Sequence, residues 1–386
     1  MDALVGKEVD REYPGYSPGL EGIMAGTTEI CYLNDDTGEL LYRGYSVSDL
    51  VNASYEEVAY LLIYGRLPNS KEFAEFSSAL VKSRKLPDDV FPIIQQLPTN
   101  AHPMDVLRTG VSLLGLSDST LQDSSKDAKM TRAIQLVAQM PVLLTEFNNH
   151  AHGLRSVKPD GSLGHAENFL YMLLGRKPDP KLAKIFNVSM VLYAEHELNA
   201  STFSARVTAS TLTDIYSAVT SAIGTLKGPL HGGANEGVAK MLIDIDDPSK
   251  AEAWVSVALA RKQRIMGFGH RIHKMTEDPR SVTIKKYAKE LGEYIGERKW
   301  YDICFALEKK MSGEKNLYPN LDLYSAVIYM LMGIPIELYT PIFVCSRIAG
   351  WCAHIIEQQE NNRLIRPRSI YTGAKSLKYV PMEKRK

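Results

Sequence analysis

Apolar residues recur along this chain at the three- and four-residue spacing of a single helix face. One such stripe consists of Tyr55, Val58, Ala59 and Leu62. It is preceded by Ser54 and Glu57, which have the spacing of a capping box, and followed by Gly65, a residue type that often ends helices. The pattern predicts a helix between Ser54 and Gly65, and similar punctuation recurs to about residue 360.

The same reasoning places two further helices in the first third of the chain. Ser70 is positioned to cap one of them, and Pro87 would end it. Its inward residues are Phe73, Phe76, Leu80 and Val81. The next helix is expected after Pro103, because proline is favoured in the first helical turn.

Two other segments complete the predicted architecture. Residues 323–346 are almost free of charge, but Pro335 and Pro341 interrupt them, so we expect two buried helices with a joint rather than a membrane span. Strand character is concentrated in 29–33 and 39–43, which predict a β-hairpin. The fold class is therefore expected to be all-α with a minor N-terminal hairpin.

Composition narrows the possible functions. The 386 residues suggest two or three domains, and 45 Lys and Arg balance 45 Asp and Glu, which argues against nucleic acid as a partner. The first residues lack a secretory apolar run, so we expect a cytoplasmic protein that is not bound to a membrane. The four cysteines form no CxxC pair, and we expect reduced core residues and no metal site.

Two histidines stand among glycines, which permit unusual backbone geometry and close approach of a ligand. They are His231 within residues 228–233 and His270 after residues 267–269. A tight turn that carries an incidental histidine is the alternative for each. No phosphate-binding loop, nucleophile elbow or dinucleotide fingerprint is present, and Ala200 stands where a zincin would need its second histidine.

Positive charge is concentrated in two segments that contain no acidic residue. Residues 253–276 carry five cations around His270, and residues 361–382 carry a further five. Such patches can hold a small polyphosphate or a carboxylate, although a solvated basic helix face would give the same pattern.

Five blocks of this chain, in order, resemble the signature segments of the citrate synthase family, which includes the 2-methylcitrate synthases. They are residues 194–202 (AEHELNAST), 227–236 (KGPLHGGANE), 265–271 (IMGFGHR), 319–322 (PNLD) and 363–368 (RLIRPR). The similarity runs from about Gly19 to the C-terminus. It implies a two-domain helical fold, with residues 1–222 and 333–386 as a large dimerisation domain and 223–332 as a smaller inserted domain.

The resemblance also implies the roles of individual residues. The catalytic residues would be Asp322 as the base, His231 at the thioester oxygen and His270 at the oxaloacetate carbonyl. The dicarboxylate would be held by His196, Arg280, Arg347 and, in a homodimer, Arg366 of the partner subunit. Coenzyme A would bind to Gln263, Arg264, Ile265, Met266, Gly267, Arg271 and Lys274. The chain departs from the family pattern by one extra residue between His270 and Arg280.

These assignments imply an acyltransferase that condenses acetyl-CoA with oxaloacetate, with no tightly bound cofactor. We favour citrate synthase, and 2-methylcitrate synthase acting on propanoyl-CoA is the alternative because residues 101–110 resemble that branch. Two other classes stay open: a metal-dependent hydrolase that uses His196, His231 and His270, and a helical binding protein without activity.

Overall fold

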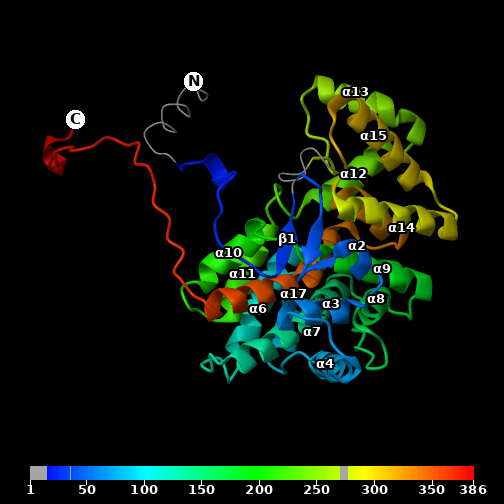
Figure 1. Cartoon of the computed structure of the whole chain (residues 1–386), viewed down its shortest axis with the longest axis horizontal. Coiled ribbons are helices and arrows are strands. Elements are labelled where there is room, and N and C mark those ends of the chain that lie inside the picture. The colour runs from blue at the N-terminus through cyan, green and yellow to red at the C-terminus, as the bar shows by residue number, and fades with distance from the viewer. Residues whose placement is uncertain (1–14, 35, 270–276) are drawn as a thin grey trace.

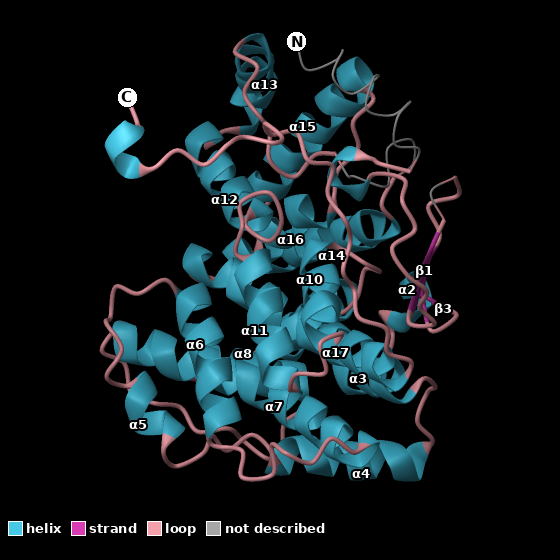
Figure 2. Ribbon diagram, turned by 90° about the vertical axis from the view of Figure 1, so that its left-hand side faces the viewer, coloured by secondary structure: helices cyan, strands magenta, loops and turns pink. Residues whose placement is uncertain are grey.

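The computed structural model describes residues 15–34, 36–269 and 277–386, and it is built mainly of helices (Figures 1 and 2). The α-helices are α2 (Val47–Leu50), α3 (Tyr55–Tyr64), α4 (Ser70–Lys82), α5 (Val90–Ile94), α6 (Pro103–Leu116), α7 (Lys126–Ala151), α8 (His165–Leu174), α9 (Pro180–Tyr193), α10 (Ala200–Ala209), α11 (Ile215–Leu226), α12 (Ala234–Ile245), α13 (Ala251–Ala260), α14 (Pro279–Ile295), α15 (Lys299–Lys315), α16 (Leu321–Leu331) and α17 (Tyr339–Glu360). Short 3₁₀ turns are η1 (Pro18–Leu20), η2 (Pro248–Lys250), η3 (Ile336–Leu338) and η4 (Met382–Lys384).

The hairpin expected near the N-terminus is confirmed. Strand β1 (Cys31–Leu33) pairs antiparallel with β2 (Leu40–Tyr42), with Cys31 opposite Tyr42. A third strand that the sequence did not predict, β3 (Tyr45–Ser46), extends the sheet to the order β1-β2-β3.

Local signals at helix ends act largely as expected. Ser54 and Glu57 form a capping box at the start of α3, and Gly65 ends that helix at φ 83°. The predicted cap of α4 is wrong by one residue, because the side chain of Asn69 accepts from the N–H groups of Lys71 and Glu72. Helix α4 also stops at Lys82, several residues before Pro87.

Helix α17 runs through the middle of the molecule and is buried along nearly its whole length. It packs against α3, α7, α9, α10 and α11. Helix α16 precedes it, on the other side of the joint at Pro335. The apolar stretch 323–346 therefore does form parts of two buried helices, as predicted. Among the described residues, no helix combines the length and the apolar character that crossing a bilayer requires.

Helices α12 to α16 gather at one end of the molecule (Figures 1 and 2). Helix α14 packs on α16, α16 on α12 and α15, and α13 on α15, while α9 and α17 connect this group to the remaining helices. The boundary between domains at 223–332 stays a prediction. After α17, Asn362 and Ile365 still bond to Ser210 at the end of α10, and the rest of the chain then extends from the helical body as a C-terminal arm (Figure 1).

Candidate active site

Asp322 lies in the first turn of α16, where Asn320 caps the helix. The side-chain oxygen of Asn320 accepts from the backbone N–H of Asp322 at 3.1 Å. The same asparagine reaches the glycine-rich turn before His270: its N–H donates to the carbonyl of Gly267 at 3.0 Å, and its side-chain amide donates to Gly269 at 3.2 Å. One residue therefore fixes both the start of α16 and the backbone that leads into His270.

The carboxylate of Asp322 is held by a tyrosine from another helix. The hydroxyl of Tyr193, the last residue of α9, donates to Oδ1 of Asp322 at 2.6 Å. The same hydroxyl lies 2.7 Å from Oγ of Ser325, one turn along α16. Because the single proton of Tyr193 is directed to the carboxylate, Ser325 is the donor in this pair, and the backbone carbonyl of Asp322, at 3.3 Å, is a second acceptor for the same proton.

Burial raises the pKa of the Asp322 carboxyl from its usual value to about 6, although the hydrogen bond from Tyr193 and the guanidinium groups of Arg280 and Arg347 act in the opposite direction. A carboxylate with this pKa is a stronger base than an exposed one, yet it is still mostly ionised at neutral pH. Asp322 thus has the properties that a general base requires.

His231 occupies the turn between α11 and α12. At the next residue, Gly232, a Cβ atom would lie 2.5 Å from the carbonyl oxygen of Leu226, so only glycine fits there. The backbone N–H of Ser201 donates to Nε2 of His231 at 3.3 Å, and Oγ of Ser201 lies 2.8 Å from the same nitrogen. Nε2 therefore acts as an acceptor.

Burial, reinforced by the positive charge of Arg347, lowers the pKa of His231 to about 4. The imidazole is consequently neutral at physiological pH. With Nε2 as an acceptor, its one proton is on Nδ1, which makes His231 a neutral hydrogen-bond donor to an oxygen that gains charge.

Phe343 of α17 links these groups by ring contacts. Its ring centroid lies 4.4 Å from that of Tyr193 and 6.2 Å from that of His231, to which it is nearly perpendicular. The guanidinium carbon of Arg347 lies 4.8 Å from the same ring. The tyrosine that bonds the base, the neutral histidine and a buried arginine thus surround one aromatic side chain.

The two arginines expected to hold a dicarboxylate are both buried, in different ways. Arg280 makes a two-pronged ion pair with Asp278, with Nε to Oδ1 at 3.1 Å and Nη2 to Oδ2 at 2.7 Å. Arg347 donates from Nε to the carbonyl of Tyr193 at 2.6 Å, and its buried Nη1 has no hydrogen-bond partner in the described part of the chain. That nitrogen is suited to bind an anion.

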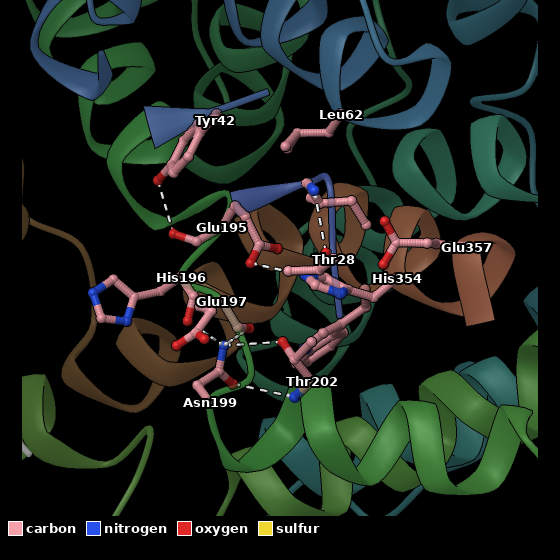
Figure 3. Close-up of polar contacts among 12 residues, drawn as sticks. Thr28, Tyr42, Leu62, Glu195, His196, Glu197, Asn199, Thr202, His354 and Glu357 are labelled. Carbon is pink, nitrogen blue, oxygen red and sulfur yellow. Dashed lines mark hydrogen bonds and ion pairs between the residues drawn. The ribbon is translucent and has the colours of Figure 1, made fainter. Parts of the chain in front are cut away.

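His196 is preceded in the chain by Glu195, whose carboxylate belongs to a buried network of charged side chains (Figure 3). The fully buried carboxylate of Glu195 accepts from Nε2 of His354 at 3.0 Å, and Nδ1 of His354 accepts from Arg206 at 3.0 Å. The hydroxyl of Tyr42, on β2, donates to the carbonyl of Glu195 at 2.8 Å. Figure 3 shows the Glu195 side chain directed to His354 and the His196 ring directed away from it.

The predicted coenzyme A segment is only partly described. Gln263 and Arg264 are exposed, Ile265 is buried, and Gly267 adopts φ 82°, where a Cβ atom would lie 2.9 Å from Leu323. His270, Arg271 and Lys274 lie outside the described residues. Among those that are described, no group of three or more His, Cys, Asp or Glu side chains is arranged to hold a metal ion.

Of the predicted residues, His231, Asp322, Arg280 and Arg347 come together, whereas Arg366 is exposed on the C-terminal arm. Sequence reasoning missed Tyr193, Ser201 and Phe343 as members of the site. Ser201 stands inside one of the signature blocks and Tyr193 directly precedes it, so their position next to His196 was the available signal.

The family model described as "Citrate synthase, C-terminal domain" matches residues 19–368. The chain belongs to the citrate synthase family. It is 48% identical over 369 residues to citrate synthase 2 of Bacillus subtilis, a match that covers 95% of this chain and 98% of that protein. It is 44% identical to 2-methylcitrate synthase 2 of Corynebacterium glutamicum, covering 95% and 97%.

A solved structure gives the same result at the level of the fold. The citrate synthase of Thermoplasma acidophilum, in a ternary complex with carboxymethyl coenzyme A and oxaloacetate, superimposes with a TM-score of 0.89 at 36% identity. That alignment covers 95% of this chain and 98% of the other. As a member of the citrate synthase family, this protein is a condensing enzyme of the acyltransferase type.

Proposed function

We propose that this enzyme condenses acetyl-CoA with oxaloacetate and water to give citrate and free coenzyme A. The observation that carries the proposal is the pairing of a carboxylate with a raised pKa, Asp322, with a neutral buried imidazole, His231. Enolate formation from a thioester needs a base of this kind together with a hydrogen-bond donor for the developing oxyanion.

In the first step, Asp322 takes a proton from the methyl group of acetyl-CoA. The electron pair of that C–H bond forms the enolate, and the negative charge moves to the thioester oxygen. The Nδ1–H of His231 stabilises this oxygen. A neutral imidazole suits the role, because it donates a hydrogen bond to the enolate oxygen and keeps its proton.

In the second step, the enolate carbon attacks the carbonyl carbon of oxaloacetate, and the new alkoxide takes a proton. We assign this proton to His270, which lies outside the described residues. His196, Arg280, Arg347 and the partner subunit's Arg366 would hold the two carboxylates. Water then hydrolyses the thioester and releases coenzyme A.

The proposal also assigns a binding site for coenzyme A. Coenzyme A serves as a co-substrate, held by residues 263–267 together with Arg271 and Lys274, and the proposed chemistry needs no tightly bound cofactor. The acid-free segment 253–276 would thereby bind the phosphates of this ligand. Closure of the smaller predicted domain, 223–332, would exclude water during the condensation.

We also propose a homodimer in which the C-terminal arm contacts the partner subunit. The arm exposes apolar side chains that an isolated chain would leave in water, among them Leu377 at 80% and Tyr379 at 81% of their full surface. Arg366 lies on the same arm. The four cysteines are buried and unpaired, which supports the cytoplasm as the compartment.

The substrate is tested by measuring oxaloacetate-dependent release of the coenzyme A thiol from acetyl-CoA and propanoyl-CoA side by side. We expect a higher kcat/KM for acetyl-CoA. The alternative, 2-methylcitrate synthase, draws support from the Corynebacterium relative, and a ratio that strongly favours propanoyl-CoA would establish it instead. The two substrates differ by one methylene group, worth about 1–3 kcal/mol in a pocket.

A further inference from the structure

We propose that Tyr193 is a positioning residue for proton removal: its hydroxyl, held by Ser325, fixes the carboxylate of Asp322 so that Oδ2 receives the substrate proton. This inference rests on the proposed function. In the step itself, the substrate C–H bond breaks, an O–H bond forms at Oδ2, and the electron pair stays with the substrate as the enolate.

The geometry around Tyr193 carries the proposal. A short chain of hydrogen bonds runs from Ser325 through the Tyr193 hydroxyl, at 2.7 Å, to Oδ1 of Asp322, at 2.6 Å. The bond occupies one carboxylate oxygen and restricts rotation of the side chain. Because Tyr193 comes from α9 and Asp322 from α16, it also fixes the base relative to a second helix.

Tyr193 contacts the site through two further groups. Its backbone carbonyl, at the end of α9 where carbonyls lack helical partners, accepts from Nε of Arg347 at 2.6 Å. Its ring stacks at an angle on Phe343, with centroids 4.4 Å apart. Since the carbonyl and the ring remain when tyrosine is replaced by phenylalanine, the hydroxyl can be tested alone.

The charge on Asp322 depends on groups from several helices. Those that act on it in the described part of the chain include Tyr193 of α9, Asp278 before α14, Arg280 of α14 and Arg347 of α17. The hydroxyl of Tyr193 stays protonated, since burial and the neighbouring carboxylate raise its pKa well above 10. It therefore donates in every state of Asp322 in which the carboxylate is ionised, and it lowers the pKa of that group.

The test is the pH dependence of kcat/KM for Tyr193→Phe. Loss of the donor destabilises the ionised base, so the acid limb should move up by about one pH unit. We expect kcat at neutral pH to fall about tenfold, while KM for oxaloacetate changes less than about twofold, because the Arg347 contact is kept. An acid limb that coincides with the wild-type limb would overturn the proposal.

Tyr329→Phe is the matched control. It removes a buried hydroxyl on α16 that bonds Ser189 at 3.3 Å rather than Asp322. We expect its acid limb to stay at the wild-type position, and an equal shift in this control would also count against the proposal. If Tyr193→Phe does not fold, Ser325→Ala replaces it, with a smaller shift in the same direction expected and an unmoved limb contradicting the role.

A second readout does not depend on turnover. The carboxyl of Asp322 can be titrated by ¹³C NMR in the unliganded protein, with Asp322→Asn used to assign its signal. We expect the midpoint to rise in Tyr193→Phe. If the wild type showed no condensation while this shift occurred, the proposed function would fail and the positioning of Asp322 by Tyr193 would stand; an unmoved midpoint would overturn the positioning alone.

Discussion

Asp322 is mostly enclosed by protein atoms beside Tyr193, and this burial raises its pKa from about 4 to about 6. The folded chain therefore binds the proton more tightly than the unfolded chain does. It follows that the free energy of unfolding falls as the pH rises from about 4 to about 6, and it stays lower above that range.

We predict that Asp322→Asn stabilises the protein above pH 7 while it abolishes the base. The gain in the free energy of unfolding should be about 1–2 kcal/mol, below the full value of a two-unit shift because the side chain keeps some contact with solvent. Urea unfolding at pH 8 and pH 4 measures it. The gain should disappear at pH 4, and an equal gain at both values would contradict the electrostatic cause.

At Gly350, in the middle of α17, helix propensity and packing predict opposite effects of an alanine substitution on stability. Alanine is favoured over glycine inside a helix by about 1 kcal/mol. Here, however, its Cβ would lie 2.2 Å from Oε2 of Glu195 and 2.4 Å from the carbonyl of Ala194. We expect Gly350→Ala to lower the free energy of unfolding by about 2–3 kcal/mol. A thermal midpoint above that of the wild type would refute the packing argument.

The residues of the site differ in how far the sequence reveals them. His231 stands out because glycines flank it, and the need for Gly232 is visible as a steric fact in the structure. Tyr193 does not stand out, because the sequence pattern gives it the position of an ordinary core residue in a buried helix. Its partner Asp322 is 129 residues away, and only the folded chain brings them together.

Helix α16 depends on Asn320 at its first turn, and this residue also binds the backbone of the Gly267–Gly269 turn. An N-cap of this kind contributes about 1 kcal/mol to stability. We predict that Asn320→Ala lowers the free energy of unfolding by about that much. It should also lower kcat, because the turn before His270 loses the hydrogen bond from the Asn320 amide to Gly269, while the bond from the backbone N–H of residue 320 to Gly267 remains. Asn320→Asp, which keeps the cap oxygen but loses the amide donor, separates the two effects.

Stability close to wild type with a reduced kcat is the result expected for Asn320→Asp. If both variants retained wild-type kcat, Asn320 would act as a helix cap and nothing more. Unfolding curves and initial rates on the same preparations provide both quantities.

Element boundaries show where local sequence decides and where it does not. The capping box of α3 is sufficient to define its start. At α4 two adjacent residues, Asn69 and Ser70, can both cap, and the structure uses Asn69 because Glu72 can then bond back to its N–H. Strand β3 has only two residues and exists by pairing with β2, so no periodicity could reveal it.

At the scale of the molecule, Arg366 is exposed and lies where the C-terminal arm begins, directly after Ile365, which is bonded to the end of α10. If Arg366 completes the site of the partner subunit, two inactive variants should complement each other. In a heterodimer of Asp322→Asn and Arg366→Ala, one site would hold an intact Asp322 and an intact Arg366 from the other subunit.

We predict that unfolding and refolding an equal mixture of these variants restores about a quarter of the wild-type activity, because about half of the dimers are mixed and each has one complete site. Each variant refolded alone is the control. Activity of the mixture equal to the mean of the two controls would show that Arg366 acts within its own chain or not at all.

The predicted division into two domains rests on the resemblance to the citrate synthase family, because composition offered only glycine-rich joints as boundaries. The charge pattern was more informative. Although the net charge of the chain is zero, residues 361–382 carry five cations and no acidic residue. Most of these residues are exposed. Sequence could indicate that this segment binds something, whereas its extension from the body became visible only in the fold.

The central claim is that this chain forms an enolate at Asp322 and condenses it with oxaloacetate. The most direct measurement is oxaloacetate-dependent release of the coenzyme A thiol from acetyl-CoA by the wild type and by Asp322→Asn. We expect release by the wild type and a rate at least about a hundredfold lower in the variant, which the unfolding curve shows to be folded. No release by the wild type, or equal rates in the two proteins, would contradict the account.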